Sequence, residues 1–235
     1  MRNPFVLFLC VLALGGTALA RTDVIVNTVI PDDDPDGIQS SQTIAGMAGS
    51  IGYATVTLNV VGGANGDLYA FLSHNGTMAV LLNRVGRNSA NPSGYRDAGF
   101  GPDAAQYSFT FDDLASHDVH YYRTFPYVLN GSGQLTGVWQ PDGRALDPES
   151  AASAFDTAPR SNPLSLFDGK DANGLWTLFI ADVSPLGEST LVSWGLNLTL
   201  VPEPASATLL RCALVTGLLW RLTRRIRCGP IRGSS

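Results

Sequence analysis

Acidic side chains are the residues of this 235-residue chain whose types and spacing most readily suggest chemistry. The stretch DDDPDG places Asp32, Asp34 and Asp36 at the spacing that opens an EF-hand calcium loop. The twelfth position of such a loop should be Glu and is Thr43, and no helical pattern flanks it. We therefore interpret the stretch as a turn whose carboxylates accept hydrogen bonds from local amides. Calcium in another geometry stays open as the cofactor, with four further candidate donors: Asp67, Asp112, Asp113 and Asp182.

The histidines give weaker candidates for chemistry. His117 and His120 lie three residues apart, and on a strand they would face opposite ways, so a shared zinc ion would need a turn there. A surface loop is the simpler interpretation. His74 lies in SHNGT, which differs from the His-Gly-Thr of a subtilisin-like protease, and the sequence has no Gly-Thr-Ser nucleophile turn. Because no nucleophile, base and orienting group can be assembled, no catalytic residue is predicted.

Charge and cysteine positions restrict the partners and the means of stabilisation. Residues 21–200 carry 19 Asp and Glu against 8 Lys and Arg, whereas residues 201–235 carry six Arg and one Glu. An acidic body repels phosphate backbones, so we predict no nucleic-acid partner. Cys10, Cys212 and Cys228 all lie outside residues 21–200, which must therefore be stable through core packing without a disulfide.

Alternation of apolar and polar residues indicates the elements that would position these groups. It is clearest in TVTLNV (55–60), LWTLFI (175–180) and LVSWGLNLTL (191–200). Such strands have one buried and one wetter face, as in an antiparallel sandwich. The predicted buried set is Val56, Leu58, Val60, Trp176, Leu178, Ile180, Val192, Trp194, Leu196, Leu198 and Leu200.

Turn signals separate these strands, at residues 62–67, 73–77, 169–174 and 184–189. His-Asn-Gly between two strand-like runs predicts a tight hairpin. The stretches 88–103 and 140–162 are typical of loops, and no long amphipathic helix pattern appears. The predicted fold class is an all-β antiparallel sandwich.

The N-terminal 20 residues have the pattern of a secretory signal peptide. Arg2 supplies the positive charge, and the apolar run 5–14 is too short to span a bilayer. Ala18 and Ala20 occupy the −3 and −1 positions, so we expect cleavage after Ala20 and export of the remainder. An uncleaved anchor is the alternative.

The segment 205–222 is a marginal transmembrane helix. Its 18 residues would span about 27 Å, slightly less than the ~30 Å hydrocarbon core. Arg211 inside the segment costs up to about 3 kcal/mol unless its side chain reaches the interface. Arginines after the segment would hold its end in the cytoplasm, leaving residues 228–235 as a cytoplasmic tail and the body outside.

This C-terminal region, residues 201–227, resembles the PEP-CTERM sorting signal of Gram-negative bacteria. The resemblance rests on three parts in order: Pro-Glu-Pro, an apolar run and an arginine cluster. It implies recognition by exosortase, a membrane-embedded enzyme, with the membrane as an intermediate location before release to the cell surface or beyond. An ordinary membrane anchor is the alternative. The sorting residues are Val201, Pro202, Glu203, Pro204, Arg224, Arg225 and Arg227.

Residues 27–200 resemble a second family, the P domain (P/Homo B) of kexin- and furin-like proprotein convertases. Gly-Asp-Leu at 66–68, Asn-Gly-Leu-Trp at 173–176, Asp182 and Ser193-Trp194 stand in the expected order. The resemblance implies a jelly-roll-like β-sandwich. In that family a neighbouring subtilisin-like domain carries out hydrolysis, and because its motifs are absent from this sequence we expect no enzyme activity.

Two functions follow as hypotheses from different classes. The first is an exported, non-catalytic module at the cell surface or in the extracellular matrix, with an exopolysaccharide or a surface protein as partner. The second is a detached P domain that docks on and stabilises a separate subtilisin-like protease. A stoichiometric protease partner in the exported fraction would favour the second.

Overall fold

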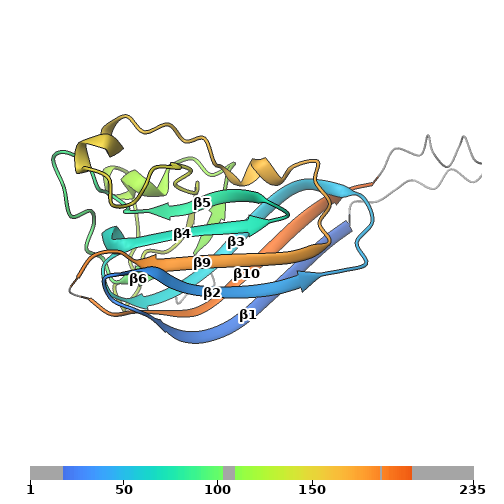
Figure 1. Cartoon of the computed structure of the whole chain (residues 1–235), viewed down its shortest axis with the longest axis horizontal. Coiled ribbons are helices and arrows are strands. Elements are labelled where there is room, and N and C mark those ends of the chain that lie inside the picture. Colours follow the sequence, from blue (N-terminus) through green and yellow to red (C-terminus); the bar gives the residue numbers. More distant parts are fainter. Residues whose placement is uncertain (1–17, 103–108, 186, 203–235) are drawn as a thin grey trace, which may run out of the picture. The chain divides into compact units, whose positions relative to one another are not determined.

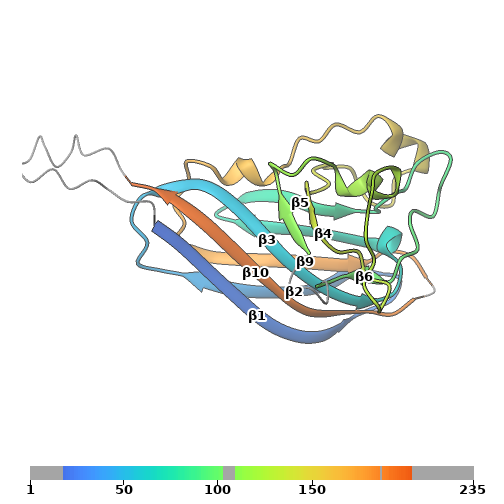
Figure 2. The same ribbon diagram turned by 180° about the vertical axis from the view of Figure 1, so that it is seen from behind.

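The computed structural model describes residues 18–102, 109–185 and 187–202. Within them the chain forms two β-sheets that share one core (Figures 1 and 2). The all-β, two-sheet prediction is confirmed. No helix in this part of the chain has the length and apolar character needed to cross a bilayer, and the predicted segment 205–222 lies outside it.

The first sheet has the strand order β1-β10-β3-β7-β8, and β6 pairs separately with β3. All its pairings are antiparallel except that of β7 with β8. Its long strands place residues from both ends of the described chain side by side. The strands are β1 (Ala18–Ile30), β3 (Ser50–Gly62), β6 (Gly99–Phe100), β7 (Thr110–Asp112), β8 (Val138–Trp139) and β10 (Ser189–Val201).

The second sheet is antiparallel throughout, in the order β2-β9-β4-β5. Its strands are β2 (Asp34–Ile44), β4 (Leu68–His74), β5 (Thr77–Asn83) and β9 (Gly174–Asp182). The predicted hairpin is the β4–β5 turn, where Asn75 and Gly76 both have positive φ, as a two-residue type I′ turn requires. The hairpin fixes the register in which His74 faces Thr77.

Short 3₁₀ turns complete the described structure. They are η1 (Asn65–Asp67), η2 (Val119–Thr124), η3 (Ala152–Asp156) and η4 (Leu164–Phe167). The predicted loop 140–162 is irregular apart from η3, and the described part of the predicted loop 88–103, residues 88–102, contains only the short strand β6. Loops therefore supply much of the surface around the sheets.

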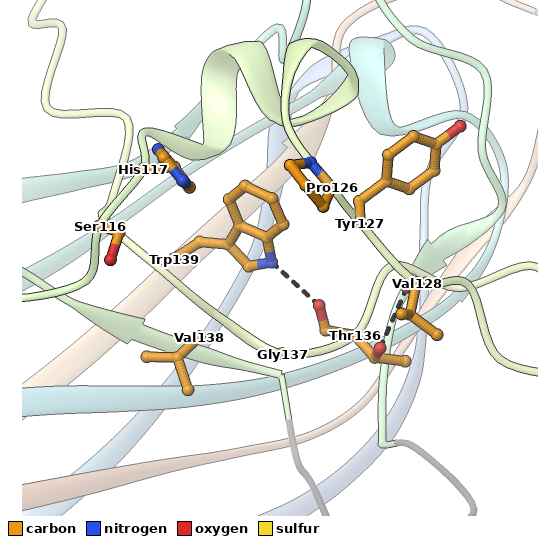
Figure 3. Close-up of a pocket in the computed structure, with 9 residues that line it drawn as sticks. All are labelled: Ser116, His117, Pro126, Tyr127, Val128, Thr136, Gly137, Val138 and Trp139. Atoms are coloured by element: carbon orange, nitrogen blue, oxygen red, sulfur yellow. Dashed lines mark hydrogen bonds between the residues drawn. The ribbon is translucent and has the colours of Figure 1, made fainter.

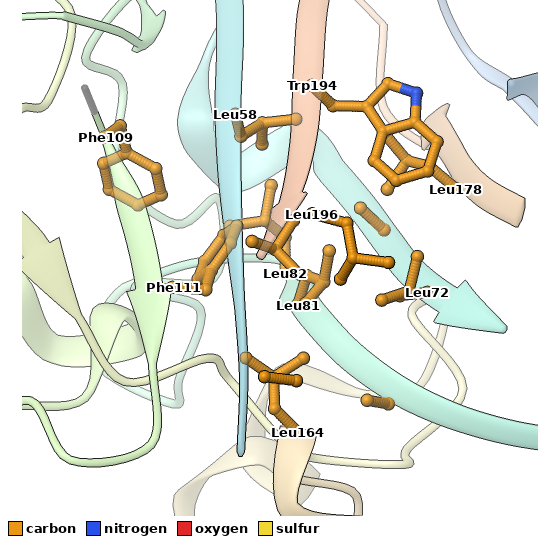
Figure 4. Close-up of a cluster of buried hydrophobic side chains, with 14 of the residues drawn as sticks. Leu58, Leu72, Leu81, Leu82, Phe109, Phe111, Leu164, Leu178, Trp194 and Leu196 are labelled. Atoms are coloured by element: carbon orange, nitrogen blue, oxygen red, sulfur yellow. The ribbon is translucent and has the colours of Figure 1, made fainter. Parts of the chain in front are cut away.

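The core lies between the two sheets and is apolar. Figure 4 draws part of it, with Leu58 and Leu196 from the first sheet and Leu72 and Leu178 from the second. Trp194 joins the layers, because its indole nitrogen donates to Ser40 Oγ of β2 over 2.8 Å. Burial of this apolar set is the main stabilising contribution in a body that has no cysteine.

The predicted buried faces are confirmed with one exception. Every member of the set is buried except Val192, and Leu191 is buried in its place. The β10–β3 register shifts between Leu191 and Ser193, which marks a β-bulge at Val192. A bulge adds one residue to one strand and so reverses the alternation of faces at that point. The prediction for Val192 was therefore wrong.

Strand β1 begins before the predicted signal cleavage site. Ala18 pairs with Leu200 and Ala20 with Leu198, and Ala20 is buried in the core. Cleavage after Ala20 would remove three residues from this strand. Residues 1–17 lie outside the described part of the chain, and the cleavage itself stays a prediction.

Candidate functional site

A pocket of about 380 Å³ lies between the segments that precede and follow η2 and the segment that carries β8 (Figure 3). Trp139 is its buried floor, with His117 on one side and Tyr127 on the other. The remaining lining residues are Ser116, Pro126, Val128, Thr136, Gly137 and Val138. The pocket therefore combines aromatic rings with hydroxyl groups.

Local hydrogen bonds hold the floor of this pocket. The Trp139 indole nitrogen donates to the Thr136 carbonyl over 2.9 Å, and the Thr136 hydroxyl donates to the Val128 carbonyl over 3.0 Å. Gly137, between them, has φ +97°, a conformation that a side chain would strain. On the wall, the His117 ring stacks on Phe125 with centroids 3.8 Å apart. These contacts preform the aromatic surface.

Among the described residues, none of those that line the pocket is Asp, Glu, Lys or Arg. The indole, the phenol and the imidazole offer apolar ring surface, and Ser116 and Tyr127 offer hydroxyl groups. A neutral ligand with one apolar face and a polar edge matches this combination. Sugar rings and short uncharged peptides have that character.

A buried histidine–aspartate pair lies in a neighbouring network. His120 Nδ1 lies 2.7 Å from Asp142 Oδ2, and both side chains are buried. His120 Nε2 lies 3.0 Å from the Arg87 carbonyl oxygen. In a catalytic triad that second nitrogen must take a proton from a nucleophile. Since it faces a main-chain carbonyl instead, we interpret this pair as structural.

The electrostatics of this network agree with a structural role. Burial by itself would raise the pKa of Asp142, but the charges and hydrogen bonds of His120 and Arg144 hold it below its ordinary value. Arg144 Nη1 lies 3.1 Å from Asp142 Oδ1 and 2.9 Å from Asp118 Oδ2. The buried carboxylate is thus ion-paired with Arg144 on one side and hydrogen-bonded to His120 on the other.

The other histidines also make contacts within the fold. His74 places Nδ1 2.9 Å from the Leu175 carbonyl oxygen and Nε2 2.8 Å from that of Asp171. His120 lies in η2 and is buried, so the surface-loop interpretation was wrong for this residue. With both its ring nitrogens engaged, His120 has no nitrogen left for the zinc ion that was weighed for His117 and His120.

The seven candidate calcium ligands separate into two groups. Asp112 and Asp113 accept hydrogen bonds from main-chain amides of Leu114, Leu164 and Ser165. Asp34 accepts one from the Asp36 amide over 3.0 Å, as the turn interpretation of DDDPDG predicts. These three carboxylates are thereby committed to main-chain amides, local ones for Asp34 and Asp112 and those of η4 for Asp113.

Two of the remaining candidates, Asp67 and Asp182, lie at one end of the second sheet. Asp34 faces Asp182 in the β2–β9 register, and Asp182 faces Leu68, next to Asp67, in the β4–β9 register. Burial raises the pKa of Asp182 to about 7, and the charges of Asp67 and Asp32 act in the same direction. Burial also raises the pKa of Asp67, against the charge of Arg84. In the described residues no group of three or more His, Cys, Asp or Glu side chains is arranged as a metal site.

The predicted sorting residues lie mostly outside the described part of the chain. Val201 ends β10 opposite Ser50, and Pro202 follows it. Glu203, Pro204, Arg224, Arg225 and Arg227 are not among the described residues. The pocket, by contrast, was not predicted from the sequence. Only the close spacing of aromatic residues from 121 to 139 could have indicated it.

No protein-family model and no curated protein matches this chain. Two solved structures are among those that match. A complex of Aeromonas sobria serine protease with its chaperone matches with 14% identity and a TM-score of 0.42, over 81% of this chain and 28% of that chain. A structure of Aeromonas sobria serine protease matches with 13% identity and a TM-score of 0.41, over 80% of this chain and 28% of that chain. The chain thus spans under a third of the length of either match.

Proposed function

We propose that this chain is an exported, non-catalytic binding module that takes a neutral surface polysaccharide into the pocket around Trp139. The observation that carries the proposal is a contrast between two sets of residues. His74 and His120 use both ring nitrogens inside the fold, whereas the pocket presents aromatic rings and hydroxyl groups to solvent. Binding therefore has a preformed aromatic surface, in which His117, the histidine that lines the pocket, is stacked on Phe125.

The fold part of the proposal is a P-domain-type sandwich with jelly-roll-like connectivity. In support, successive strands alternate between the sheets: β1 lies in the first, β2 in the second and β3 in the first again. The chain returns to the second sheet for β4 and β5, and its last two strands also divide between the sheets. Such crossing is typical of double-sheet jelly rolls.

The delivery part of the proposal is exosortase-type processing of residues 201–227. In support, the last strand ends at Val201, where Pro-Glu-Pro begins, so the sequence pattern changes where the sandwich ends. A cell-surface or matrix location after an inner-membrane intermediate follows from this pattern and from the signal peptide.

The ligand test uses the full chain and exopolysaccharide from the native host. We expect retardation in affinity electrophoresis through polysaccharide gels, and at least about tenfold weaker binding for His117→Ala/Tyr127→Ala, which removes two ring walls, each worth about 1 kcal/mol. Leu175→Ser, an exposed apolar change on the second sheet, is the matched control. Equal retardation of the double variant and the control would refute the pocket assignment. Hydrolysis of the polysaccharide would refute the non-catalytic role.

A protease-accessory function is the second candidate, and the rim of the pocket favours it. Tyr127, Val128 and Val138 are 40%, 59% and 51% exposed, and such neighbouring apolar groups are common in protein interfaces. Capture of a subtilisin-like protease at one-to-one stoichiometry from the exported fraction, lost in Val128→Ser/Val138→Ser, would establish this function in place of polysaccharide binding.

A further inference from the structure

Three segments bring acidic side chains together at the end of the second sheet where β9 terminates. Asp67 lies in η1, Asp182 is the last residue of β9, and Asp32 lies between β1 and β2. The charge of Asp32 acts on both of the other carboxylates. The Val183 amide donates to the Asp67 carbonyl over 2.9 Å, so η1 and the end of β9 are joined directly.

Two of these carboxylates are buried and incompletely bonded. The Asp67 residue is 2% exposed and Asp182 is 0% exposed. Their Oδ2 atoms are both buried and have no hydrogen-bond partner among the described residues. Leaving a buried carboxylate oxygen without a partner is costly, so such groups acquire a cation, a donor or a proton.

Within the described part of the chain, one positive side chain lies within ion-pair distance of these two carboxylates. Arg84 Nη2 lies 3.7 Å from Asp67 Oδ1, which is a loose contact. The other donors of Arg84 are directed elsewhere, since Nε donates to the Gly66 carbonyl over 2.6 Å and Nη1 to the Val183 carbonyl over 3.1 Å. Arg96 acts on Asp67 from further away, and the Ser184 amide donates to Asp182 Oδ1 over 3.3 Å. The negative charge of the cluster therefore exceeds its positive charge.

We propose that Asp67 and Asp182 bind one calcium ion through their Oδ2 atoms. Carboxylate oxygens are hard ligands that suit calcium, and the cluster offers no cysteine or histidine for a softer metal. Calcium takes six to eight oxygen ligands in flexible geometry, so main-chain carbonyls and water would complete its shell. The proposal is independent of the pocket around Trp139 and of its ligand.

The test is calcium binding by the full chain after removal of metal with chelator. Isothermal titration calorimetry with calcium chloride should show saturable binding near one ion per chain, and the melting temperature should rise with calcium concentration. Asp67→Asn and Asp182→Asn should each weaken calcium affinity by at least about tenfold. Metal sites lose about that much affinity even when only a residue that hydrogen-bonds to a ligand is changed.

Asp33→Asn is the matched control, because it removes one negative charge from an exposed position in the neighbouring turn. It should bind calcium like the wild type. Near-UV circular dichroism of the tryptophans checks that each variant is folded. If Asp182→Asn is unfolded, Asp67→Asn provides the test. Absence of saturable heat in the wild type, an equal response to magnesium, or an equal loss in Asp33→Asn would each overturn the proposal.

Discussion

At the scale of single residues, the buried carboxylate of Asp142 is stabilised by specific partners. Asp142 lies between His120 and Arg144, and Arg144 also contacts Asp118 and lies over the Tyr121 ring at 5.1 Å. These contacts join residues from η2 to the loop that follows β8. The network therefore positions the backbone that carries one wall of the pocket.

Asp142→Asn should destabilise the fold by about 3–5 kcal/mol at pH 7, because it removes the buried carboxylate that bonds both His120 and Arg144. Urea unfolding followed by tryptophan fluorescence measures the change. Asp23→Asn, in an exposed pair with Arg21, should cost less than about 1 kcal/mol.

The buried carboxyl group of Asp142 should also make the stability of the fold depend on pH. The pKa of Asp142 is lowered in the folded state, so its contribution is fully present above the unfolded value of about 3.9. It is lost as pH falls through the lower folded value, since protons then favour the unfolded chain. Asp142→Asn should flatten that part of the stability–pH curve, and parallel curves for variant and wild type would contradict the assignment.

Trp194→Ala should cost about 3–5 kcal/mol, as expected when a large buried ring is removed. Trp194 is 1% exposed and lies in the core between the sheets. Chemical denaturation of the full chain gives the value, with Leu175→Ala, which changes an exposed side chain, as control. Unchanged stability of Trp194→Ala would mean that the indole is not a core group.

At the scale of elements, close contact of two loops fixes the position of η1. A Cβ added at Gly66 would lie 2.6 Å from Gly94 Cα and 2.6 Å from the Ser93 carbonyl oxygen. The Gly66 amide donates to the Tyr95 carbonyl over 2.6 Å, so the two backbones are hydrogen-bonded as well as close. The Gly-Asp-Leu motif at 66–68 therefore has a packing requirement for its glycine.

Gly66→Ala should destabilise the domain by about 1–3 kcal/mol, because the added methyl group forces the two backbones apart. The control is Gly131→Ala, where a Cβ meets nothing within 4 Å. Thermal unfolding of both variants makes the comparison. Equal melting temperatures would show that the loops can separate without cost.

At the scale of the whole molecule, the sandwich ends where the predicted sorting signal begins. β10 terminates at Val201, and Pro202 and Pro204 restrict the residues that precede them to extended backbone. An extended stretch is the form in which a protease cleft accepts its substrate. Processing at this C-terminal stretch would then leave β10 complete.

We therefore expect the mature protein from the native host to end near Pro204, as measured by C-terminal mass spectrometry. Substitution of Pro202, Glu203 and Pro204 together by alanine should trap the full-length form in the membrane fraction, because the extended recognition stretch is lost. A chain ending at Ser235 in wild-type cells with active exosortase would contradict the prediction.

The sequence by itself determined the fold class, most buried faces and the β4–β5 hairpin. These features depend on the alternation of apolar and polar residues and on turn residues, both of which are set by residues close together in the sequence. The sequence did not predict which way the Val192 side chain faces. A bulge depends on how two strands align, and neither strand shows that alignment alone.

Only the tertiary structure decided which polar residues meet. Asp67 and Asp182 are 115 positions apart in the chain, and pairing of β4 with β9 brings them to one end of a sheet. The pocket likewise needs residues 116–128 to lie against residues 136–139. Such contacts follow from packing across long loops. Loop residues have no periodic sequence pattern from which their contacts could be predicted.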